Sequence, residues 1–104
     1  MRWYHFPVWF AGGAFFVNAL PHFFNGVSGD AFQSPFATPP GVGLSPAVFN
    51  VLWGAINFSI AWLLLARVGS FELRNVKPAL AAGLGGFLAA APLAWCFGQF
   101  HGGR

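Results

Sequence analysis

Two histidines and three asparagines have the residue types and the spacing to form a binding site. Asn18 and His22 are four residues apart and therefore share one face of a helix. Asn50 and Asn57 share a face of a second helical segment, and His101 lies near the end of a third. Imidazoles from two helices can ligate a haem or a divalent metal, and a single imidazole can ligate a chlorophyll magnesium or hydrogen-bond a quinone carbonyl. The candidate cofactor-binding residues are therefore His22, His101, Asn18, Asn50 and Asn57, and their spacing identifies no particular cofactor.

The same side chains also fit a structural role. Polar groups at membrane depth are costly unless hydrogen bonds satisfy them, and intramembrane amides often crosslink helices. Asparagines on neighbouring helices would then hold those helices together and bond to carbonyls left without a donor by Pro21 or Pro92. Both interpretations stay open from the sequence.

Three apolar segments must position these residues. The middle segment is the clearest, because no ionisable residue occurs from Ala47 to Ala66 and Arg67 follows directly. A helix over residues 46–67 would be roughly 33 Å long, which matches a hydrocarbon thickness of about 30 Å. The sequence therefore predicts an all-α membrane protein with a single transmembrane domain over residues 1–104. The three predicted transmembrane helices cover about residues 4–24, 46–67 and 78–99.

Composition excludes several classes of protein. Only 7% of the residues are charged, while 57% are hydrophobic and 19% are aromatic, which does not suit a domain surrounded by water. The net charge of +3 comes from scattered basic residues that form no stripe for a phosphate backbone, so we expect no nucleic-acid partner. The predicted spans hold no carboxylate, and the catalytic motifs of hydrolases, phosphate loops and zinc proteases do not occur. The sequence predicts a protein that is not an enzyme, and a buried structural role for Cys96.

A Pro/Gly-rich connection joins the first two predicted helices. The stretch from Ser28 to Ser45 carries prolines that exclude a regular helix, and its Phe32 and Phe36 are expected to anchor it over the helix ends as a lid. Ser45 and Pro46 are expected to be the N-cap and the first residue of the second helix.

Basic residues indicate the orientation. The connection between the second and third predicted helices holds Arg67, Arg74 and Lys77, whereas the connection from Ser28 to Ser45 holds no basic residue. By the positive-inside bias, the basic connection and the N-terminus are cytoplasmic, and the Pro/Gly-rich loop and the C-terminus are outside. We expect a location in the bacterial cytoplasmic (inner) membrane.

Small residues in the third predicted helix indicate close helix packing. They form two rows at four-residue spacing, Ala82, Gly86 and Ala90 beside Ala81, Gly85 and Ala89. Helices in lipid associate through such close contact rather than through hydrophobic burial. The rows serve packing within the chain, or one of them docks a membrane-protein partner or a second copy of the chain.

Three motifs occur within roughly the first 60 residues. These are Asn18-Ala-Leu-Pro-His-Phe23, Pro35-Phe-Ala-Thr-Pro-Pro-Gly41 and Asn50-Val-Leu-Trp-Gly54. The pattern resembles a group of small bacterial integral membrane proteins of uncharacterised function. The resemblance implies no activity, but it groups the polar residues with the Pro/Gly-rich loop.

Three functional hypotheses follow from these patterns. The leading one is a small polytopic membrane protein that acts through helix packing with other membrane subunits, for example as an accessory subunit of a respiratory or photosynthetic complex. The second is a haem, chlorophyll or quinone site at the outer face, built from His22 and His101. The third is a small channel or carrier formed by an oligomer.

Overall fold

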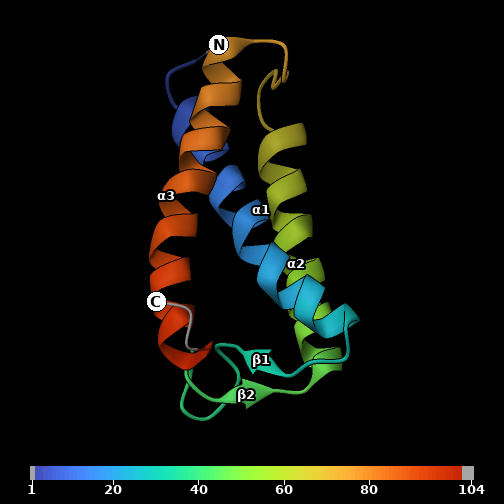
Figure 1. The fold of residues 1–104 in the computed structure, drawn as a ribbon. Coiled ribbons are helices and arrows are strands. Elements are labelled where there is room, and N and C mark those ends of the chain that lie inside the picture. The colour runs from blue at the N-terminus through green and yellow to red at the C-terminus, as the bar shows by residue number, and fades with distance from the viewer. Residues whose placement is uncertain (1, 102–104) are drawn as a thin grey trace.

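The computed structural model describes residues 2–101, which form three helices and a small antiparallel sheet (Figure 1). The elements in chain order are α1 (His5–Val27), β1 (Phe32–Gln33), β2 (Leu44–Ser45), α2 (Ala47–Ala66) and α3 (Val76–His101). The Cα extents are 41 × 26 × 22 Å, and the long dimension is comparable to a whole bilayer of about 40–45 Å.

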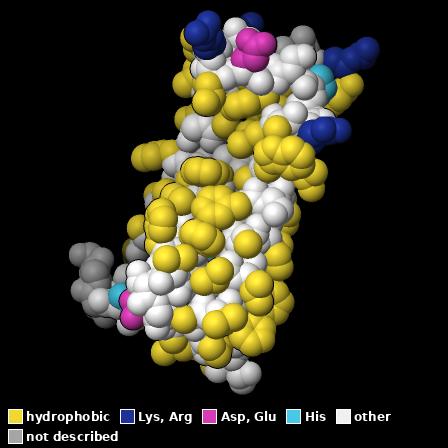
Figure 2. Space-filling model, turned by 90° about the vertical axis from the view of Figure 1, so that its right-hand side faces the viewer, with side chains coloured by type: hydrophobic (Ala, Val, Ile, Leu, Met, Phe, Trp, Pro, Cys, Tyr) yellow, Lys and Arg dark blue, Asp and Glu magenta, His cyan; other side chains and the backbone are white. Residues whose placement is uncertain are grey.

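Two of the helices have the length and composition to cross a membrane. The apolar windows of α2 and α3 have mean hydropathies of 1.8 and 1.7, and only 22% and 11% of their residues are buried. A core helix of a water-soluble protein would be mostly buried, whereas apolar side chains cover much of the surface here (Figure 2). The prediction of a mostly helical structure is confirmed, and α2 and α3 are long and apolar enough to span a membrane, as the sequence predicts. The third span, at α1, stays a prediction, because α1 is not among these helices.

The central helix is α1, which packs against both α2 and α3 (Figure 1). Glycines at the contacts let the backbones approach closely. A Cβ at Gly54 of α2 would come within 2.8 Å of Phe23, and a Cβ at Gly85 of α3 would overlap the carbonyl of Phe10. These close contacts fix the positions of the two outer helices along α1.

Both small-residue rows of α3 lie towards α1. Gly85 and Gly86 are buried, while the alanines of the rows are half-buried: Ala81, Ala82, Ala89 and Ala90. A Cβ at Gly13 of α1 would overlap the carbonyl of Ala82, so this row packs within the chain as the other does. The exposed surface of α3 is formed instead by large side chains, among them Leu84, Phe87 and Trp95.

The start of α2 differs from the prediction. Pro46 is the N-cap and makes no side-chain cap bond, and the helix begins at Ala47. Ser45 belongs to β2, where its hydroxyl lies 2.6 Å from that of Ser34. The serine is therefore used in holding the loop closed, because a buried hydroxyl needs a partner and Ser34 lies opposite it.

Two further expectations need correction. The protein is not entirely α-helical, because Phe32 pairs with Ser45 and Gln33 with Leu44 in a two-stranded sheet. Cys96 is exposed rather than buried, as is its neighbour Trp95.

Candidate functional site

Four of the candidate residues form a hydrogen-bonded cluster between α1 and α2. This polar cluster consists of Asn18, His22, Asn50 and Asn57. Nδ2 of Asn18 donates to Oδ1 of Asn57 at 3.0 Å, and Nδ1 of His22 lies 2.9 Å from Oδ1 of Asn50. Asn50 and Asn57 are completely buried and His22 is 3% exposed, so the cluster lies inside the helix packing. The cluster thus crosslinks two helices, as the structural interpretation of the sequence expects.

The surroundings of Asn50 determine which nitrogen of His22 carries a proton. Nδ2 of Asn50 lies between 3.1 and 3.3 Å from three backbone carbonyls, those of Phe32, Ser45 and Pro46. The amide nitrogen must face these acceptors, so its Oδ1 faces His22 and accepts the proton on Nδ1. The Nε2 of the neutral ring is then left with a free lone pair, the arrangement that a histidine ligand or hydrogen-bond acceptor needs.

The Pro/Gly-rich loop covers the polar cluster. Phe32 is buried, and its ring packs edge-on to His22 at 5.5 Å and against Phe97 of α3 at 4.7 Å. The prediction that Phe32 anchors the loop over the helix ends is confirmed. Phe36 is 64% exposed, but its ring contacts Trp53 at 5.0 Å, so it covers the edge of the same region.

His101 does not join the polar cluster directly. Its ring stacks on Phe32 at 5.1 Å, and its Nε2 lies 2.8 Å from Oε1 of Gln33. His22 and His101 therefore contact the same phenylalanine but bond to different amides. Within residues 2–101 no group of three or more His, Cys, Asp or Glu side chains could hold a metal ion.

A pocket of about 140 Å³ lies beside the polar cluster and under the loop. The residues that line it include Asn18, His22, Ser34, Trp53 and Phe97. Nε1 of Trp53 is buried and has no hydrogen-bond partner in the part of the chain that the structure describes. No hydrogen bond to Nε2 of His22 occurs among these residues either. Trp53, which has the unpaired donor, and His22, which has the free acceptor, thus line the same pocket.

No family model, curated protein or solved structure matches the chain.

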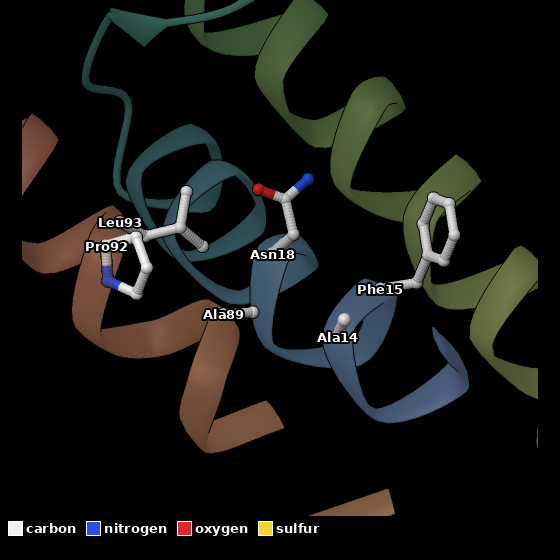
Figure 3. A pocket seen from close by; sticks show the side chains of 6 residues that line it. All are labelled: Ala14, Phe15, Asn18, Ala89, Pro92 and Leu93. Carbon is white, nitrogen blue, oxygen red and sulfur yellow. The ribbon is translucent and has the colours of Figure 1, made fainter. Parts of the chain in front are cut away.

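A second, apolar crevice of about 360 Å³ lies between α1 and α3 (Figure 3). The residues that line it are Ala14, Phe15, Asn18, Ala89, Pro92 and Leu93. Phe15 is 36% exposed, so the crevice is open to the surroundings of the helices. Asn18 also lines the polar pocket, so this side chain borders both spaces.

Several residues of the site were not predicted from the sequence. The sequence analysis singled out neither the Trp53 N–H nor Phe97, and it gave Ser34 no role. A signal for Trp53 was present, because it lies between Asn50 and Asn57 on the polar face of α2. Phe97 gives no such signal, because its contact with Phe32 joins segments distant in the sequence.

Proposed function

We propose that this protein is a three-span membrane protein of the bacterial cytoplasmic membrane that binds a small hydrogen-bonding ligand between His22 and Trp53. The observation that supports the proposal is the buried, unpaired N–H of Trp53, a residue that lines the same pocket as His22. Leaving a buried donor unpaired costs about 1–3 kcal/mol, so such groups usually mark a bound water or ligand. A ligand that accepts from Trp53 and donates to His22 would satisfy both groups.

Binding of phenol tests this proposal. In the ¹⁵N-labelled protein in detergent micelles, we expect phenol to shift the indole N–H resonance of Trp53 more than those of Trp62 and Trp95, which are exposed. Toluene has a similar ring but no hydroxyl, so it should not produce this shift. Trp53→Phe identifies the resonance. Equal shifts of all the indole resonances with phenol would contradict the proposal and leave the pocket as a water site.

A second candidate function is the packing of this chain against another membrane subunit. It is favoured by the exposed surface of α3, which carries large apolar side chains, among them Leu84, Phe87 and Trp95. Such a surface can pack against a further helix through van der Waals contact. Native mass measurement after purification with lipids tests this function, and recovery of a lone monomer would count against it.

The proposed orientation places the ligand pocket at the outer face. The pocket lies at the end of the helices that carries the sheet, whereas Lys and Arg side chains gather at the opposite end (Figures 1 and 2). By the positive-inside bias the basic end is cytoplasmic. The 23 residues of α1 span roughly 34 Å, and α1 lies between two apolar helices, which supports a third span.

Reporter fusions test the orientation. We expect a phosphatase that is active only outside the cytoplasm to be active when inserted after Gly41, in the Pro/Gly-rich loop, and inactive after Gly69, in the basic connection. Both glycines are exposed connection residues with positive φ, at 75° and 62°, and such sites tolerate insertions. The reverse pattern of activity would overturn the assigned orientation.

A further inference from the structure

Two matched stripes of side chains lead from the apolar crevice into the polar pocket. On α1, Ala14, Asn18 and His22 follow one another at intervals of four residues, and on α3, Ala89, Leu93 and Phe97 do the same. The first members of each stripe line the crevice, and the last members line the pocket. The two spaces share Asn18 in their linings, so the stripes run from an apolar crevice along the helices to a polar pocket at the end that the loop covers.

The polar end selects a hydroxyl group. Nδ1 of His22 is occupied by Asn50, so the Nε2 of the neutral ring can accept a hydrogen bond but cannot donate one. The Trp53 N–H can only donate. A ligand must therefore donate to His22 and accept from Trp53, and a hydroxyl does both. A carbonyl has no proton to donate to His22.

The dimensions of the two spaces select a ring and a chain. A volume of about 140 Å³ is close to the roughly 150 Å³ cavity that holds one benzene ring in another protein, and the Phe97 and Trp53 rings help to wall it. The crevice of about 360 Å³ is apolar apart from Asn18 and falls within the usual range of about 300–1,000 Å³ for ligand pockets. It suits a hydrocarbon chain that enters from the bilayer.

We infer that the ligand is a membrane lipid whose head is a single hydroxylated aromatic ring, a phenol or a hydroquinone. This inference rests on the proposed function and extends it to the ligand class. The ring lies between His22 and Trp53 under Phe32, and the chain follows the crevice past Asn18 towards Ala14. The reduced, hydroxyl-bearing form of such a lipid binds in preference to its oxidised, carbonyl-bearing form, because the Nε2 lone pair repels a carbonyl oxygen.

The test compares four probes on the purified full chain in lipid nanodiscs. The probes are a hydroquinone with a ten-carbon chain, the corresponding quinone, the same hydroquinone without the chain, and decanol. Calorimetric titration is expected to give the chain-bearing hydroquinone an affinity at least about tenfold higher than that of any other probe, because a difference of 1.4 kcal/mol suffices for tenfold. Trp53→Phe is expected to weaken both hydroquinones about tenfold through the lost N–H.

Variants in the crevice distinguish the contribution of the hydrocarbon chain to the affinity from that of the ring. Ala89→Phe, and independently Ala14→Phe, fill the crevice and are expected to weaken the chain-bearing hydroquinone about tenfold while changing the chainless one less than about twofold. Ala91→Phe is the matched control, because Ala91 is exposed on another face of α3 and should change neither affinity. Thermal melting of each variant verifies that it is folded.

Each result has a defined consequence. Equal affinity for the quinone or for decanol would overturn the inference that the ligand has a hydroxylated ring. An unchanged affinity of both folded crevice variants for the chain-bearing hydroquinone would overturn the inference that the chain lies in the crevice. In those cases the proposed function still stands if binding of the chainless hydroquinone depends on Trp53. If neither hydroquinone binds, both the inference and the proposed function fail.

Discussion

Replacement of Asn50 by leucine is expected to lower the free energy of unfolding by about 3–5 kcal/mol and to detach the loop of residues 28–45 from the helix ends. Asn50 is completely buried, and its amide serves three loop and helix carbonyls as well as His22. Leucine has a similar volume but no polar atoms. The carbonyls of Phe32 and Ser45 and the ring of His22 would therefore lose the bond from Asn50 while still buried, which costs more than the net value of the bonds themselves; the carbonyl of Pro46 keeps the backbone N–H of residue 50.

Hydrogen exchange gives the measurement for this variant. Backbone amides of the sheet, between Phe32 and Ser45, should exchange much faster in Asn50→Leu than in the parent protein, and the melting temperature should fall. Gln99→Leu is the matched control, because Gln99 is exposed and its amide bonds only to the carbonyl of Trp95 on its own helix. Similar exchange in the two variants would show that Asn50 does not hold the loop.

A second variant at the same position, Asn50→Asp, separates the two contacts that Asn50 makes. If only the contact with His22 of α1 matters, this variant should have the loop protection and the stability of the parent protein, which Asn50→Leu loses. Asn50→Asp retains an acceptor for His22 but loses the donor to the carbonyls. We expect it to keep His22 oriented yet to leave the loop exchanging rapidly.

Helix positions followed from the sequence because each depends on local signals. The absence of charge from Ala47 to Ala66 and the arginine that follows predict α2 to within one residue at each end. The ends of α1 and α3 were predicted two or three residues short, because Asn25 and His101 are polar but still helical. The spacing of four residues between Asn18 and His22, and of seven between Asn50 and Asn57, also placed each pair on a shared helix face, and the hydrogen bonds between the two pairs agree with this.

The arrangement around the site did not follow from local signals. Ser34 and Ser45 pair across eleven residues, and Phe32 meets Phe97 and His101 from the far end of the chain. Such contacts depend on which helix occupies the centre, and spacing within a segment does not contain this information. The packing of α3 could not be predicted for the same reason. Its two rows of alanine and glycine indicated close packing, but they did not show that both rows pack against α1.

Replacement of Gly85 by leucine is expected to destabilise the protein by at least about 3 kcal/mol, because α1 and α3 would have to separate. A Cβ at Gly85 would overlap the backbone carbonyl of Phe10, and backbone cannot rotate away as a flexible side chain can. Separation would also widen the crevice next to Ala89, so we expect weaker binding of the chain-bearing hydroquinone.

Unfolding in increasing dodecyl sulfate, followed by circular dichroism, measures the stability. Gly83→Leu is the control: no atom lies within 4 Å of a Cβ there, and helix propensity should make it neutral or more stable by up to about 1 kcal/mol. Equal stability of the two leucine variants would show that α1 and α3 are not in close contact in the membrane.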